Sequence, residues 1–108
     1  MNLSEKQIEQ LKDFFEKADK KRLMYAPDED KAYYLHGFMS GMREYLEELE
    51  VDIPGITGLW WYENLGEPRR SMSIKELSER YSKESWLVHV LSGYESAKTT
   101  VQEILNLK

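Results

Sequence analysis

The chain of 108 residues contains no cysteine, and it has only two histidines, His36 and His89. The lack of cysteine excludes disulfides, thiolate metal sites and cysteine nucleophiles. Neither histidine has a second histidine three or four residues later, and no Glu-x-x-His sequence occurs. Zinc and di-iron sites in helical proteins need several such ligands that face inward. The sequence therefore predicts no metal site and no cofactor.

The motifs of the common enzyme classes are also missing. No Gly-x-Ser-x-Gly elbow occurs, and the pair Gly37 and Gly41 is not followed by the Gly-Lys-Ser/Thr of a phosphate loop. Acidic residues crowd positions 44 to 52, but they form a charged run and do not lie among apolar residues that would separate their pKa values. Since no nucleophile, base and orienting group share a pattern, we expect a protein that is not an enzyme.

Long apolar runs and an excess of positive charge are absent as well. No stretch approaches the ~18 apolar residues that cross a bilayer. The polar N-terminal stretch MNLSEKQIEQ lacks the charged-then-apolar layout of a signal peptide. The 20 acidic and 15 basic residues give a formal net charge of -5, which argues against a nucleic-acid coat or a binder of anionic membranes. We expect a cytoplasmic protein with no membrane partner.

The chain does contain apolar residues at helical spacing, most regularly between Lys31 and Leu49. At about 100° per residue they fall on one arc of roughly 140°. This pattern predicts an amphipathic helix around which the rest of the chain packs. Its apolar side consists of Tyr34, Leu35, Phe38, Met39, Met42, Tyr45, Leu46 and Leu49, and its polar side of Tyr33, His36, Gly37, Ser40, Glu44 and Glu47.

Three further segments have helical spacing. They predict a first helix from Leu3 to about Leu23, a short helix from Ser73 to Tyr81, and a final long helix after Ser82 that ends near Leu105. The final stripe repeats at alternating three- and four-residue steps, so it could pack inside the molecule or form a homodimer with a second copy. The stripe consists of Leu87, Val90, Tyr94, Ala97, Val101 and Ile104.

Sequence signals also mark where these helices begin. Ser4 with Gln7, and Ser73 with Glu76, have the spacing of capping boxes. Pro27 breaks the chain after the first helix, and Asp28 is placed to cap the second. Because this break is short, the first two helices should be antiparallel neighbours.

The segment from Val51 to Met72 is the least regular part of the chain, with prolines and glycines at both of its ends. Residues 59–65 could form a short helix capped by Thr57, or a strand for which no partner strand is evident. We predict an all-α fold, a single helical domain over residues 1–108. It is a compact bundle of three long helices and one short helix, with this aromatic, Pro/Gly-containing connection between helices two and three.

The second predicted helix has two features that its core does not require. Gly37 and Gly41 each cost about 1 kcal/mol relative to alanine inside a helix. The acidic residues at its C-terminal end lie where the helix dipole disfavours negative charge. Close packing of another helix on the glycines and a solvated acidic surface would explain both. A binding surface for a partner is the alternative explanation, and it is the less favoured of the two.

Protein binding is the function that these features favour. Small residues let another backbone approach, an acidic surface can steer a basic partner, and tryptophan and tyrosine are enriched among interface hot spots. We therefore expect a small acidic regulator, adaptor or inhibitor that binds a protein with a basic surface. Size and charge alone suggest, by analogy with mobile-element proteins, a nucleic-acid enzyme as its target. The candidate residues are Tyr33, His36, Ser40, Glu44, Glu47, Glu48, Glu50, Trp60, Trp61 and Tyr62.

One alternative is a DNA-binding regulator that uses residues 73–91 as a helix-turn-helix. A local excess of positively charged residues in and near this segment favours the alternative. Its candidate residues are Arg69, Arg70, Lys75, Arg80 and Lys83. Against it, Ser82 stands where the turn glycine is usual, and Lys83 stands where the turn needs a buried apolar residue. The second helix would also present apolar side chains to the bases. Nucleic acid is therefore the less favoured partner.

A second alternative is a small-molecule sensor with an aromatic pocket. Its walls would come from Trp60, Trp61 and Trp86. The consecutive aromatic residues of the connection cannot all point inward from one regular element, so at least one ring should be near the surface. A ligand-dependent change in tryptophan fluorescence would distinguish this alternative from the other two.

Overall fold

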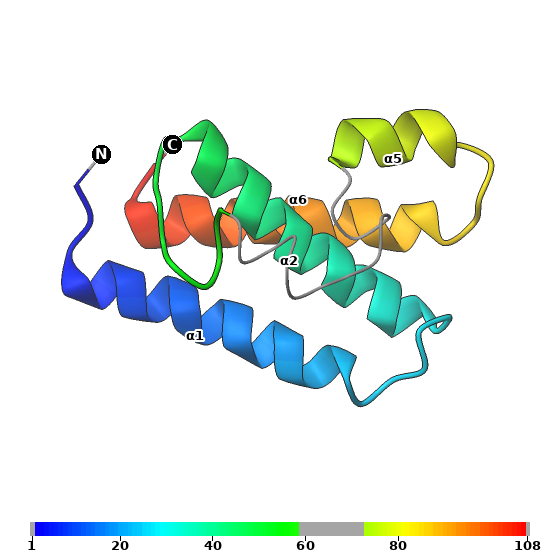
Figure 1. Cartoon of the computed structure of the whole chain (residues 1–108), viewed down its shortest axis with the longest axis horizontal. Coiled ribbons are helices and arrows are strands. Elements are labelled where there is room, and N and C mark those ends of the chain that lie inside the picture. Colours follow the sequence, from blue (N-terminus) through cyan, green and yellow to red (C-terminus); the bar gives the residue numbers. More distant parts are fainter. Residues whose placement is uncertain (1, 59–72, 108) are drawn as a thin grey trace.

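The computed structural model of the chain describes residues 2–58 and 73–107 (Figure 1). Within these ranges it contains four helices and no strand beyond an isolated bridge between Pro54 and Thr57. This arrangement confirms the predicted all-α fold of three long helices and one short helix. The helices are α1 (Glu5–Arg22), α2 (Asp30–Glu48), α5 (Ile74–Arg80) and α6 (Leu87–Leu105).

Helix α1 begins at the predicted capping box. The Ser4 hydroxyl accepts the backbone N–H of Gln7 at 3.1 Å, and the Gln7 side-chain oxygen accepts the N–H of Ser4 at 2.9 Å. Ser73 caps α5 by accepting the N–H of Glu76 at 3.1 Å, while the Glu76 carboxylate accepts from the Ser73 hydroxyl at 3.3 Å, so the reciprocal backbone bond seen at Ser4 is not reproduced. These contacts join residues three positions apart, which is why the sequence predicts them.

Helix α2 begins differently from the prediction. Its N-cap residue is Glu29 rather than Asp28, and no side chain caps the helix. The Glu29 carboxylate instead accepts the backbone N–H of Ala26 at 2.6 Å, so it closes the turn behind the helix. Asp28 remains exposed, and the proposed Asp28 cap is wrong. The turn still makes α1 and α2 antiparallel, as Figure 1 shows.

The main core lies where α1, α2 and α6 meet. It is completed by the segment that follows α2, which inserts Ile53 and Ile56, each 1% exposed. Apolar residues from elements far apart in the sequence thus share one cluster. Its largest fully buried side chains are Leu11, Met39, Met42, Leu46, Ile53, Ile56 and Val101.

Glycines bring α2 and α6 into backbone contact. A Cβ on Gly37 would lie 2.0 Å from the carbonyl oxygen of Val90, and a Cβ on Gly41 would lie 2.8 Å from the Cα of Tyr94. These distances leave no room for a side chain. The backbone that approaches these glycines is therefore the chain's own α6.

This packing corrects the predicted polar side of α2. Gly37 is buried and Ser40 is only 5% exposed. A single apolar arc describes a helix that is buried on one side, whereas α2 has α1 on one side and α6 on another. On the side of α2 that faces α6, small residues let the two helices pack closely, so that side is buried although it carries no large apolar side chains.

Helix α6 begins at Leu87, several residues later than predicted. The six residues from Tyr81 to Trp86 form the turn between α5 and α6. Beside this turn lies a second, smaller apolar cluster of Leu77, Leu87 and Val90. Partly buried residues pack against it, namely Tyr33, Ile74, Tyr81 and Trp86.

Candidate protein-binding site

The segment that follows α2 has a defined backbone path. Glu50 adopts a positive φ of 59°, and the N–H of Val51 bonds the carbonyl oxygen of Leu46 at 2.8 Å, which ends the helix. The buried Thr57 hydroxyl accepts the N–H of Ile53 at 2.9 Å and lies 2.6 Å from the carboxylate of Asp52, to which it donates. These bonds hold residues 50–57 against the core.

Glu47 ties this segment to α2. Its carboxylate accepts one hydrogen bond from the Arg43 guanidinium at 3.0 Å and one from the backbone N–H of Gly58 at 3.3 Å. Arg43 is 3% exposed, so its charge lies inside the protein and is balanced by Glu47. The spacing of Arg43 and Glu47, four residues apart on one helix, is a signal that could have revealed this pair from the sequence.

Glu48 and Glu50 differ from their neighbours because their side chains are exposed and form no hydrogen bond or ion pair among the residues that the structure describes. They lie on either side of the end of α2. We call the set Glu47, Glu48, Glu50 and Asp52 the acidic end. All four of its side chains are exposed, and two of them hold the local backbone.

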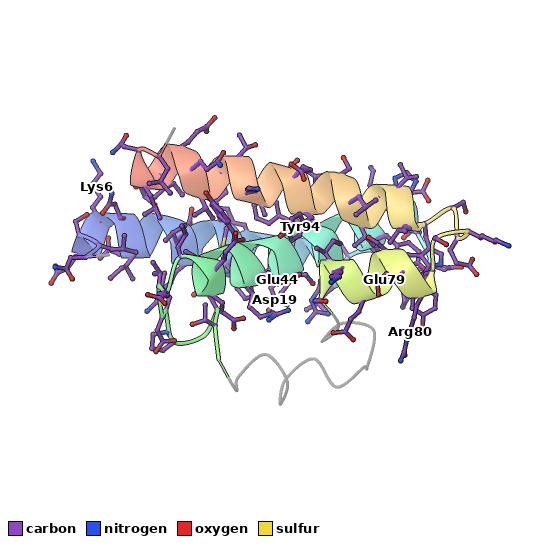
Figure 2. The ribbon with its side chains drawn as sticks, turned by 90° about the horizontal axis from the view of Figure 1, so that it is seen from above. Lys6, Asp19, Glu44, Glu79, Arg80 and Tyr94 are labelled. Atoms are coloured by element: carbon purple, nitrogen blue, oxygen red, sulfur yellow. The ribbon has the colours of Figure 1, made fainter. Side chains whose placement is uncertain are left out.

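Glu44 has a separate role, although it is only one turn away. Both of its carboxylate oxygens lie close to the backbone N–H of Ile74, at 3.0 and 3.2 Å, so Glu44 caps the first turn of α5 (Figure 2). Burial raises the pKa of the Glu44 carboxyl above its ordinary value of 4.5, while the Ile74 N–H and the Arg43 guanidinium lower it by less. Glu44 is therefore engaged inside the molecule.

The other predicted binding residues on α2 do not gather with the acidic end. Tyr33 stacks on Trp86 with ring centroids 5.0 Å apart and planes 13° apart, and both rings are half-buried. His36 is half-buried, and Ser40 is enclosed between helices. Tyr33 thus packs against the small apolar cluster, and Ser40 is buried, so neither belongs to an open surface with the acidic end.

The aromatic connection lies outside the described residues. The predictions for Trp60, Trp61 and Tyr62, and those for Arg69 and Arg70, therefore stay predictions, as does the choice of helix or strand for residues 59–65. The third tryptophan of the predicted aromatic pocket, Trp86, contacts the rings of Tyr33 and Tyr81.

The three candidate DNA-binding residues that the structure describes, Lys75, Arg80 and Lys83, are exposed and are interspersed with acidic residues. Lys75 and Arg80 lie on α5 beside Glu76 and Glu79, and Lys83 follows in the turn. Figure 2 shows Glu79 and Arg80 together on this short helix. The turn of six residues is longer than the three or four residues of a helix-turn-helix. The geometry gives this alternative little support.

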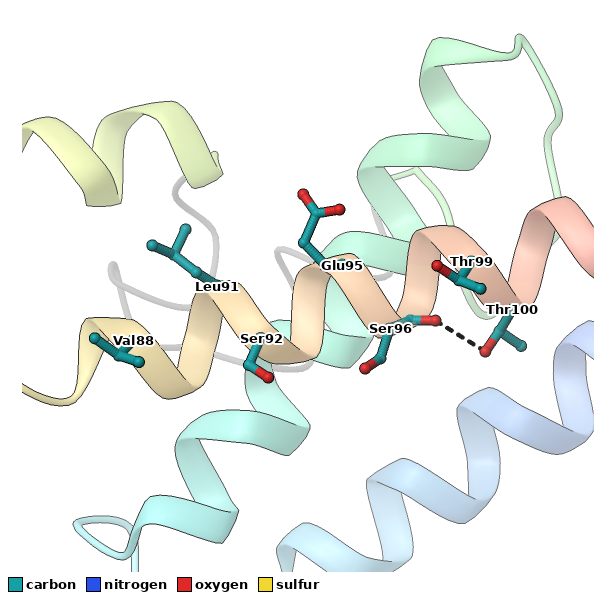
Figure 3. A pocket seen from close by; sticks show the side chains of 7 residues that line it. All are labelled: Val88, Leu91, Ser92, Glu95, Ser96, Thr99 and Thr100. Carbon is teal, nitrogen blue, oxygen red and sulfur yellow. Dashed lines mark hydrogen bonds between the residues drawn. The ribbon is translucent and has the colours of Figure 1, made fainter. Parts of the chain in front are cut away.

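The predicted dimer stripe of α6 is directed at α2 and contributes to the cores. The outer side of the helix carries an open groove of about 690 Å³ (Figure 3). Val88 and Leu91 are its exposed apolar residues, and Glu95 lies between them and the C-terminal half. In an antiparallel pair of α6 helices centred on Glu95, the two carboxylates would be close and would repel each other, whereas a pair centred on Leu91 would separate them; the homodimer through α6 stays a prediction. The groove is lined by Val88, Leu91, Ser92, Glu95, Ser96, Thr99 and Thr100.

Three further findings concern residues 2–58 and 73–107 only. No group of three or more histidine, aspartate or glutamate side chains could hold a metal ion there. The pair His89 and Asp30, 3.4 Å apart, joins the starts of α6 and α2. None of the helices in these ranges is long and apolar enough to cross a membrane.

No protein-family model, curated protein or solved structure matches the chain. A proposal for its function therefore rests on the geometry of its own residues.

Proposed function

We propose that the chain is a non-enzymatic protein-binding module that acts as a regulator, adaptor or inhibitor, and that its acidic end docks on a basic surface of another protein. The observation that supports this is the position of Glu48 and Glu50. Both are exposed and lack an intramolecular cation in the described part of the chain. Glu48 is the last residue of α2, and Glu50 begins the segment that the Thr57 hydrogen bonds hold.

The arrangement suits electrostatic docking for two reasons. Carboxylates that form no ion pair in the free protein gain the most interaction energy from a lysine or arginine of the protein that binds. They also accelerate association of the two proteins at low salt. A backbone already fixed by Ile53, Ile56 and Thr57 loses little conformational entropy when a partner binds. The basic surface could belong to an enzyme that acts on nucleic acid, because such surfaces are built to bind phosphate.

The first experiment is a pull-down with the tagged protein from nuclease-treated lysate of its host, followed by mass spectrometry. The comparison is between the wild type, a Glu48→Lys/Glu50→Lys variant, and a matched Glu9→Lys/Glu16→Lys variant on α1. Glu9 and Glu16 are exposed, and their reversal changes the net charge by the same amount. Glu47 is left intact because its carboxylate holds Arg43 and Gly58.

The proposal predicts one protein, retained in stoichiometric amount by the wild type and the α1 variant but lost from the Glu48/Glu50 variant. With that protein purified, the Glu48/Glu50 reversal should weaken binding by about 10-fold or more at low salt and by less at high salt. Equal binding by all three proteins would contradict the proposal. Recovery of nucleic acid alone, when nuclease is omitted, would favour the DNA-binding alternative.

A further inference from the structure

We propose that residues 73–86 form a strap, made of α5 and the turn after it, that opens as a unit while α1, α2 and α6 stay packed. This opening does not depend on whether the acidic end binds a partner. Its consequence is that a face of α2 and α6 which is covered in the closed state becomes accessible.

The first argument is the size of α5. It has seven residues, and a helix of this length is not stable in water without tertiary contacts. Leu77 is its only buried residue. By comparison, α6 buries six residues along its length. The strap therefore depends on few contacts, and the long helices do not depend on it.

The second argument is that the strap packs on its own apolar cluster. Leu77 clusters with Leu87 and Val90, while the rings of Tyr81 and Tyr33 each contact the Trp86 ring, with centroid separations of 5.2 and 5.0 Å. This cluster is separate from the main core around Met42. Regions with few apolar contacts of their own open at lower free energy than the main core of a protein.

The third argument is the polar attachment of the strap. Within residues 2–58 and 73–107, the bond from the Ile74 N–H to the Glu44 carboxylate is the hydrogen bond that joins α5 to α2. Figure 2 shows Glu44 on α2 beside the start of α5, with Tyr94 on the side toward α6. This bond lies at the N-terminal end of α5, so α5 can leave without disrupting the backbone hydrogen bonds within the long helices.

That attachment is also a weak one. The charged groups around the Glu44 carboxylate are Arg43 and Glu47 on α2 and Glu76 on α5, and the Tyr94 phenol lies on α6. Burial raises the pKa of the Glu44 carboxyl, the Ile74 N–H and the Arg43 guanidinium lower it by less, and Glu47 and Glu76 add smaller increases, so that the net shift is upward. The ionised carboxylate is therefore held under a closed strap at an energetic cost, and opening returns it to water.

Opening of the strap would change the surface in two ways. It would expose Tyr33, Leu87 and Val90, an aromatic and aliphatic face that the strap now covers. It would also release the carboxylate of Glu44 one turn away from the acidic end. Two of the α2 residues that the sequence suggests for binding, Tyr33 and Glu44, are thus covered by a short segment of the same chain.

The absence of native cysteine allows a direct test with single-cysteine variants and iodoacetamide. Val90→Cys places a thiol under the strap, and Val101→Cys places one in the main core. Both are the same substitution on the same helix, at sites 4% and 0% exposed. Under native conditions the thiol at position 90 should be alkylated at least ~10-fold faster than the thiol at position 101, because local opening exposes only the first.

Substitutions of Glu44 in these two backgrounds complete the test. Glu44→Ala removes the acceptor for the Ile74 N–H and should accelerate alkylation at position 90 by several-fold more than at position 101. Glu44→Gln retains an acceptor oxygen and should not. Equal rates at the two positions, matching global unfolding, would overturn the proposal. Hydrogen exchange of the unmodified protein gives a second measurement, and α5 amides that exchange as slowly as those of α2 would overturn it too.

Discussion

The peptide group of Val90 occupies the space that a side chain at Gly37 would need. A Cβ at Gly37 would lie 2.0 Å from the Val90 carbonyl oxygen, and a Cβ at Gly93 would lie 2.0 Å from the carbonyl oxygen of Tyr34. Each helix thus contributes a glycine against which the backbone of the other packs. The obstacle in each case is backbone, which cannot rotate away as the end of a flexible side chain can.

Alanine at Gly37 or Gly93 should destabilise the protein, although alanine favours a helix by about 1 kcal/mol over glycine. Overpacking of a rigid contact usually costs about 1–3 kcal/mol and sometimes more, so the net free energy of unfolding should fall. Urea denaturation followed by circular dichroism measures the change. Ser92→Ala, on the exposed side of α6 next to Gly93, is the control and should shift stability by less than about 0.5 kcal/mol.

The Glu44 cap predicts different effects for two substitutions of the same residue. Glu44→Ala should lower the free energy of unfolding by about 1 kcal/mol, because the first N–H of α5 loses its acceptor. Glu44→Gln should preserve or raise stability at pH 7, since the amide oxygen still accepts and the buried charge near Glu47 and Glu76 is gone. A glutamine variant as unstable as the alanine variant in denaturant titrations would mean that the charge itself is required.

The raised pKa of Glu44 predicts the sign of a pH dependence. In the unfolded chain the carboxyl loses its proton near its ordinary pKa of 4.5, while the folded protein keeps the proton to higher pH. Between those two pKa values the folded state binds more protons, so this group's contribution to stability is complete below pH 4.5 and is lost as the pH rises through the folded value. The stability gap between Glu44→Gln and the wild type should therefore widen from pH 4.5 toward pH 7. If the gap narrowed over this range, folding would lower the pKa of Glu44 and not raise it.

The buried Thr57 hydroxyl is predicted to stabilise the segment that carries the acidic end. Thr57→Val leaves the Ile53 N–H without its 2.9 Å acceptor and should cost about 1–3 kcal/mol. Thr57→Ser keeps the hydroxyl and should cost about 0.8 kcal/mol for the lost methyl group. Thr99→Val, at an exposed position of α6, is the matched control. If Thr57→Val were no more damaging than the control in thermal unfolding, the hydroxyl would not hold this segment.

The sequence alone determined the helices and the start of α1 and of α5. The capping contacts of Ser4 with Gln7 and of Ser73 with Glu76 join residues three apart, and apolar spacing along one helix reports which side faces the core. Interactions of such short range can be predicted without knowledge of the rest of the molecule. Composition and missing motifs are likewise properties of the chain itself, and they do not depend on how the helices pack.

Tertiary structure alone decided what covers α2 and what remains exposed on it. The bond between Glu44 and Ile74 joins residues 30 positions apart, and the stack of Tyr33 on Trp86 joins distant parts of the chain. Neither leaves a local pattern, so Tyr33, Ser40 and Glu44 had the sequence features of a free surface. Packing of α6 on the glycines and of α5 on Glu44 removed them from it. Glu48 and Glu50 remain outside because α2 ends there and no other described helix extends over them.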